Sequence, residues 1–145
     1  MPSAEDQLRF VTRIQALILG SDHAATYKLP FLLSMGDLCM ESPVEPDEDH
    51  DLDWDSLALS FAEYYWPIAE RYIVNGESHW LRQGTSSRNA VTDKLREYRI
   101  GDVASKRFAD ARKDERFRRE FLPKIKTTLR SQPATYLQPK GEHFL

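Results

Sequence analysis

The chain has 145 residues, of which 41% are hydrophobic and 30% are charged, and its formal net charge is −3. This size and composition are typical of one globular domain with its own core, and they exclude a disordered chain or a protein built on long apolar membrane spans. The single cysteine, Cys39, excludes an internal disulfide framework, and the acidic N-terminus carries no secretory signal, so a cytoplasmic protein is expected.

The first predicted element is a helix over residues 4–19. Apolar residues recur along it in steps of three and four, Ser3 can cap its start and Gly20 can end it. A second helix is predicted over residues 26–40. It is apolar on almost every side, so we expect it to be the most buried helix, with Leu33 in the core.

Residues 41–53 read as an acidic loop. Aspartates at alternate positions from Asp47 to Asp55 invite a comparison with calcium-binding loops. The comparison fails because Leu52 stands where the sharp turn needs glycine and Ala58 stands where the closing glutamate belongs. A solvated acidic loop is therefore the favoured interpretation, and no metal site is predicted.

The central element is a helix over residues 54–65, capped by Asp53 and carrying Phe61 at the middle of its apolar stripe. Pro67 lacks a backbone donor and disfavours α geometry at the preceding residue. A bend is therefore predicted at Trp66–Pro67, followed by a second helix that starts with Pro67. The favoured interpretation is a core helix, and the alternative is that the bend presents Trp66 to a partner.

Shorter elements follow the bend. Asn75–Gly76 and Gly84 are turn signals in a connecting segment. A helix is predicted from residues 86–87 to 98, with Leu95 facing inward, and a short helix over residues 102–111. After Ser131 the chain is predicted to be extended, and its apolar end suggests a domain cut from a longer protein.

The segment from Asp114 to Arg130 is amphipathic. Phe121 and its apolar neighbours at helical spacing define one side, and five basic residues fall opposite them at 100° per residue. Pro123 leaves open whether the segment is one helix or two. Two interpretations of the basic side remain open: an ordinary solvated face, or a phosphate-binding face. These five residues are Arg112, Arg116, Arg119, Lys126 and Arg130.

The charge distribution along the chain bears on that choice. Residues 1–80 hold fifteen acidic and four basic residues, a net charge of −11, whereas residues 81–145 hold eight acidic and sixteen basic residues, a net charge of +8. Such a division predicts that the basic part meets a polyanion, or that the two parts meet each other.

No catalytic constellation is recognisable. The sequence has no G-x-S-x-G, no Gly-rich phosphate loop and no H-E-x-x-H, and its four histidines lack metal-ligand spacing. Cys39 lies in an apolar stretch and is interpreted as a buried structural thiol. We predict no catalytic residue, metal or cofactor.

Several short motifs occur in a recognisable order. T-Y-K at 26–28 opens an apolar helix, F-x-x-Y-Y-W-P at 61–67 follows an acidic loop, and P-x-x-Y-L-Q at 133–138 follows a basic helix. This order resembles the N-terminal module that precedes the nuclease domain in some bacterial HNH-type endonucleases of the restriction or phage-defence kind. The resemblance implies a helical DNA-recognition or regulatory module, with cutting done by a His-Asn-His domain further along the chain.

The expected protein is therefore a mainly α single domain of five or six helices with a short extended C-terminal segment, whose partner is DNA. The alternative is a helical protein-interaction or dimerisation module with no nucleic-acid role, and a homodimer is a further expectation. The predicted phosphate contacts are Arg112, Arg116, Arg119, Lys126 and Arg130, with Arg88, Arg96 and Arg99 as a second group. Aromatic rings can stack on an unpaired base or line a pocket, so the predicted selective contacts are Tyr27, Lys28, Tyr65 and Trp66.

Overall fold

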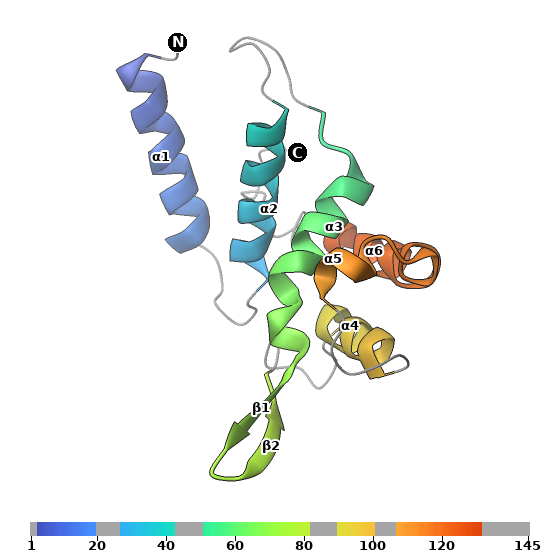
Figure 1. The fold of residues 1–145 in the computed structure, drawn as a ribbon. Helices are drawn as coiled ribbons and strands as arrows, with labels where there is room; N and C mark the ends of the chain where they lie inside the picture. Colours follow the sequence, from blue (N-terminus) through green and yellow to red (C-terminus); the bar gives the residue numbers. More distant parts are fainter. Residues whose placement is uncertain (1–2, 20–26, 43–50, 82–89, 101–106, 132–145) are drawn as a thin grey trace.

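The computed structural model describes residues 3–19, 27–42, 51–81, 90–100 and 107–131. Within these segments the chain is mainly helical, with six α-helices and one two-stranded hairpin (Figure 1). This confirms the predicted fold class, while the extended segment predicted after Ser131 lies outside the described residues. The helices are α1 (Ala4–Leu19), α2 (Lys28–Glu41), α3 (Trp54–Tyr65), α4 (Ala90–Ile100), α5 (Phe108–Ala111) and α6 (Leu122–Ser131). Among the described helices, none combines the length and the apolar character that a membrane crossing requires.

Helix α3 lies at the centre of the fold and packs against α2, α4 and α6 (Figure 1). It starts at Asp53, whose carboxylate accepts a hydrogen bond from the Ser56 backbone N–H at 2.9 Å and so satisfies one of the donors that a helix start leaves open. Leu57, Phe61 and Tyr65 follow in steps of four and are all buried. The predicted bounds and core face of this helix are therefore confirmed.

The predicted second helix after Pro67 is wrong. Only a 3₁₀ turn, Pro67–Ala69, follows α3, and Glu70 then adopts an extended backbone conformation. Strands β1 (Arg71–Val74) and β2 (Glu77–Trp80) form an antiparallel hairpin instead. Tyr72 and Ile73 lie exposed on β1.

The turn residues explain this hairpin. Asn75 and Gly76 have positive φ angles of 52° and 82°. Two consecutive residues of this kind make the tight turn whose twist matches that of paired strands, and Asn-Gly is its preferred sequence. The predicted turn at Asn75–Gly76 is thus confirmed, whereas the chain on each side of it is extended rather than helical.

Aromatic rings fill the core between α3, α4 and the C-terminal helix. Tyr98 on α4 makes edge contacts with Phe117 at 5.0 Å and with Phe121 at 5.3 Å between ring centroids. The Trp66 ring makes an edge contact with Phe108 at 5.4 Å. Such offset and edge geometries are the favourable ones for aromatic pairs. The predicted burial of Leu95 and Phe121 is confirmed, as is that of Phe61.

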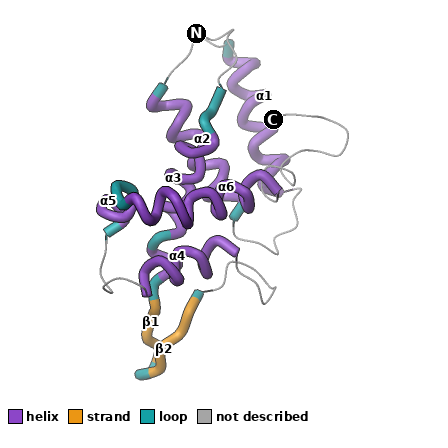
Figure 2. Tube along the Cα trace, turned by 90° about the vertical axis from the view of Figure 1, so that its right-hand side faces the viewer, coloured by secondary structure: helices purple, strands orange, loops and turns teal. Residues whose placement is uncertain are grey.

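The amphipathic C-terminal segment is one continuous helix over residues 115–131, and Pro123 does not divide it. A π-helical turn, Phe117–Phe121, precedes the proline, and the Leu122 N–H bonds to the carbonyl of Phe117, five residues back. A wider turn of this kind spreads the backbone just where the proline ring would meet the preceding turn and where its missing N–H would leave a gap. The helix therefore continues through Pro123. The C-terminal part of the chain is drawn as helix up to the end of α6 (Figure 2).

Helix α2 is not the most buried helix, contrary to the prediction. Only Phe31 and Ser34 on it are buried, while Leu33 is 43% exposed and Cys39 is exposed as well. The predicted core position of Leu33 and the predicted burial of the thiol are therefore wrong. The physical reason is that α2 packs extensively against α3 alone among the described elements, so a helix that is apolar all round is covered on one side only.

Candidate nucleic-acid interface

Four of the five predicted phosphate contacts lie on the helix over residues 115–131, and Arg112 lies in the turn before it. The helix starts after Asp114, whose carboxylate accepts a hydrogen bond from the Arg116 backbone N–H at 2.9 Å and another from the Tyr98 hydroxyl at 2.5 Å. The start of the helix is thus capped by an acid that is itself anchored to α4.

Three of these cations have acidic partners. Arg116 pairs with Glu120 and Arg119 pairs with Glu115, each at 3.4 Å and at i,i+4 spacing. Lys126 pairs with an acid on α3, Asp55. The two glutamates reach their arginines because side chains four residues apart lie next to each other on a helix, whereas Asp55 reaches Lys126 from the neighbouring helix α3.

Two of the five predicted phosphate contacts, Lys126 and Arg130, instead contact the start of α3. Lys126 bonds to Asp55, and the Arg130 guanidinium lies 5.6 Å from the centre of the Trp54 ring, in cation–π geometry. These two side chains therefore help to hold the C-terminal helix against α3.

The second predicted group consists of Arg88, which lies outside the described residues, and two arginines of α4. The Arg99 side chain is 11% exposed, donates to the Trp66 carbonyl at 2.8 Å and to Glu70, and lies 4.7 Å from the centre of the Trp66 ring. These contacts join α4 to the end of α3, so Arg99 is committed to the interior of the fold.

Arg96 is committed in the same way. Its guanidinium bonds to the carbonyl of Leu81 and lies 4.5 Å from the centre of the Trp80 ring, at the base of the hairpin. Burial lowers the pKa of the Arg96 guanidinium below its usual value, opposed by the nearby charge of Asp93. The Nε atom of Arg96 has no hydrogen-bond partner among the described residues.

The four predicted selective contacts do not form one exposed site. Tyr65 is completely buried and Trp66 is 6% exposed, so neither ring offers a face to an unpaired base. Tyr27 and Lys28 are half-buried at the start of α2, where Tyr27 packs against the core. The candidate interface is therefore built without the two core rings.

A different set of cations remains available, and we call Arg112, Lys113 and Arg118 the basic triad. All three are exposed, and none of their side chains forms an ion pair with an acid in the described part of the chain. The Arg118 guanidinium donates to the Arg112 carbonyl at 3.4 Å, which links the helix to the turn before it. The triad is thus a set of three exposed cations, close together in the chain, that form no ion pair among the described residues.

Spacing along the sequence does not single out the triad. The acids nearest to it are already engaged: Asp110 pairs with Arg107, and Asp114 caps the helix and accepts from Tyr98. Only the structure shows this, because Asp110 stands three residues before Lys113 and Asp114 stands four residues before Arg118, at spacings that would allow ion pairs.

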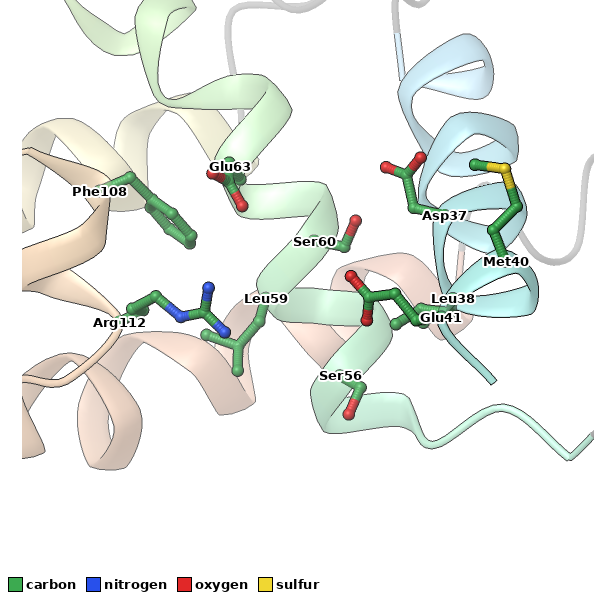
Figure 3. A pocket seen from close by; sticks show the side chains of 10 residues that line it. All are labelled: Asp37, Leu38, Met40, Glu41, Ser56, Leu59, Ser60, Glu63, Phe108 and Arg112. Carbon is green, nitrogen blue, oxygen red and sulfur yellow. The ribbon is translucent and has the colours of Figure 1, made fainter. Parts of the chain in front are cut away.

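A groove of about 370 Å³ lies beside the triad, between α2 and α3 (Figure 3). Asp37, Glu41 and Glu63 contribute carboxylates to its wall, and Arg112 contributes the single guanidinium of the lining. Asp37 accepts a hydrogen bond from the Tyr64 hydroxyl at 2.6 Å, which raises the pKa of Tyr64. Three carboxylates repel phosphate, so the groove marks an acidic border of the candidate interface rather than part of it.

The described residues contain no group of three or more His, Cys, Asp or Glu side chains placed to hold a metal ion. Neither the curated proteins nor the solved structures include a significant match to this chain. One family does match, over residues 7–144, which is nearly the whole length of the sequence. The chain therefore belongs to the family described as "Domain of unknown function (DUF8808)".

Proposed function

We propose that this chain is the DNA-recognition or regulatory module of an HNH-type restriction or phage-defence endonuclease and that it binds the phosphate backbone of DNA. The order of its sequence motifs, which resembles the modules ahead of such nuclease domains, supports the endonuclease assignment. The net charge of +8 over residues 81–145 supports a polyanionic partner. In this proposal a nuclease domain that follows in the same polypeptide cuts the DNA, and the present chain positions it.

The observation that carries the proposal is the basic triad of Arg112, Lys113 and Arg118. On the described C-terminal helix, Arg116, Arg119 and Lys126 pair with acids, and Lys124 and Arg130 lie over aromatic rings. The side chains of the triad form no ion pair with an acid of the described residues. Exposed cations without an acidic partner are free to bind phosphates, and each such contact releases condensed counterions from the DNA. The triad is therefore the first contact that we assign.

Arg116 and Arg119 provide the next contacts. Their ion pairs are exposed and long, and exposed pairs contribute only about 0–1 kcal/mol each. A phosphate can therefore displace the glutamate from either arginine at little cost. Lys126 and Arg130 contribute less in this proposal because both are engaged with the start of α3.

A salt titration tests the proposal. Binding of the chain to a fluorescent duplex is followed by anisotropy for the wild type and for a variant with Arg112, Lys113 and Arg118 all changed to Ala. Each lost phosphate contact lowers the slope of log affinity against log salt by about 0.9, so the triple variant should lose about 2.7 from the slope. Binding to unrelated sequences should weaken about equally, because phosphate contacts carry no sequence information.

The matched control removes the same charge from the acidic half. Arg9, Arg13 and Arg71 are exposed, and changing all three to Ala should leave the slope as in the wild type. The proposal fails if the wild type does not bind DNA at low salt, or if the folded triad variant binds as well as the wild type. A helical protein-interaction module with no nucleic-acid role then takes its place, since an interface built on apolar contacts changes little with salt.

A further inference from the structure

Helices α1 and α2 both carry apolar side chains that other described elements do not cover. On α1, Leu8 is 68% and Val11 is 48% exposed. On α2, Leu29, Leu33 and Met40 are 43–75% exposed and follow one another, together with Gly36, in steps of four, three and four. We call these four residues the α2 stripe, because that spacing places them on one side of the helix.

Helix α1 has little support from the other described elements. The extensive contacts among the described elements do not include α1, and Figure 1 shows it standing beside the rest of the molecule. Isolated helices of about 15 residues are marginal in water, and most helices in proteins are stabilised by packing of an amphipathic face. A helix of 16 residues with an uncovered apolar face therefore needs a partner surface.

Gly36 gives an independent indication of where that surface lies. Glycine is a poor helix former, yet it stands in the middle of α2. A Cβ atom built at Gly36 meets nothing within 4 Å, so the packing of this chain does not require glycine there. Glycine at such a point lets another backbone approach closely.

We propose that the α2 stripe is the docking surface for α1 of a second copy of this chain, and that two copies exchange their α1 helices in a symmetric dimer. Such an exchange closes on itself, because each copy offers both the helix and the surface that receives it. The inference goes beyond DNA binding and does not depend on it.

The size of the contact supports a dimer. A helix of 16 residues is about 24 Å long and about 10 Å wide, so one docked helix covers roughly 240 Å² on each of two faces. Two dockings bury about 1,000 Å² in total. This value is at the lower limit for a specific interface between proteins, which predicts a weak dimer rather than an obligate one.

The charges beside the α2 stripe and beside the apolar residues of α1 favour a helix from another chain. When α1 lies parallel to α2, a shift of 23 residues places Glu5, which flanks Leu8 and Val11 on α1, beside Lys28. Within one chain the two helices run in opposite directions (Figure 1), which places the first turn of α1 level with the acidic end of α2 at Glu41. A second copy can adopt the parallel alignment, in which Glu5 meets Lys28.

Sedimentation equilibrium of the whole chain over about 1–200 µM tests the proposal. The wild type should show a monomer–dimer equilibrium within this range, and Leu33→Glu should be monomeric. Gly36→Leu should weaken dimerisation at least tenfold and keep the helical circular dichroism of the monomer, because the side chain has room in the monomer but blocks the approach of a helix. Ile100→Glu is the control, since Ile100 is also an exposed apolar residue but lies on α4.

Charge reversal tests the identity and the direction of the docked helix. Glu5→Lys and Lys28→Glu should each weaken the dimer, and the double variant should restore it. A monomeric wild type at the highest concentration overturns the proposal, as does a dimer that Leu33→Glu leaves intact. A monomer that Leu33→Glu destabilises also overturns it, because a segment of the same chain then covers the stripe.

Discussion

Replacing Arg99 by Ala should destabilise the fold without changing the affinity of the chain for DNA. Arg99 was predicted to bind phosphate, but its guanidinium donates to the Trp66 carbonyl and to Glu70 and stacks on the Trp66 ring. The Trp66 carbonyl lies where α3 ends, and the next turn bonds to the Pro67 carbonyl instead. Arg99 therefore supplies the donor that a continued helix would have provided.

The expected loss follows from these three contacts. A hydrogen bond from a charged donor contributes about 1.5–3 kcal/mol, the cation–π contact about 0.5–1 kcal/mol, and the half-exposed pair with Glu70 about 0.5 kcal/mol. Contributions at one site overlap, so we expect a loss of about 3 kcal/mol for Arg99→Ala. Arg99→Lys should lose roughly half of this, because lysine keeps the charge but not the planar group that stacks and bonds at once.

Urea unfolding followed by tryptophan fluorescence measures this loss, and Arg118→Ala is the control. Arg118 is exposed, so its removal should change stability by no more than about 0.5 kcal/mol. The anisotropy titration supplies the second readout, in which Arg99→Ala should leave the salt slope unchanged. A variant with wild-type stability and a slope lowered by about 0.9 would refute the reasoning, since Arg99 would then contact phosphate.

Three further predictions concern stability. Phe61→Ala should lower the free energy of unfolding by about 3–5 kcal/mol, because the ring is completely buried; a loss below 1 kcal/mol in urea would contradict its core position. The pKa of Asp53 is lowered, chiefly by the hydrogen bond from the Ser56 N–H and then by that from its hydroxyl. This carboxylate stabilises the fold above its unfolded pKa of about 3.9, so stability should fall as the pH drops from about 5 to 3, and less steeply in Asp53→Asn. Tyr98→Phe should cost about 1–2 kcal/mol in thermal unfolding because Asp114 loses a donor, and an unchanged melting temperature would argue against that bond.

The elements that the sequence predicts well are those in which one strong signal acts alone. The capped, periodic segments over residues 4–19 and 54–65 have the predicted bounds, and Phe61, Leu95 and Phe121 are buried as their spacing indicates. At residues 67–80 two signals compete. The helical spacing of apolar residues continues through Ile73, but a tight turn at Asn-Gly and β-branched neighbours favour a hairpin, and the hairpin is what forms.

The basic face could be predicted only in part, because helical projection gives directions and not partners. It placed Arg116 and Arg119 correctly on an exposed surface, and the acids that pair with both are visible at i,i+4 spacing. The pairing of Lys126 with Asp55 could not be foreseen, because the two are 71 residues apart in the sequence. The exposure of Leu33 is likewise a tertiary property, since it depends on which neighbours α2 meets.

The hairpin also has a consequence for how the molecule opens. Its strands make extensive contacts only with each other among the described elements, and β1 is exposed along its whole length. Two-stranded hairpins are marginal on their own, and this one contacts α4 where the Arg96 guanidinium lies over the Trp80 ring. In hydrogen exchange its ladder amides should therefore open as a separate unit at low free energy, while the amides of α3 should exchange only when the whole molecule unfolds.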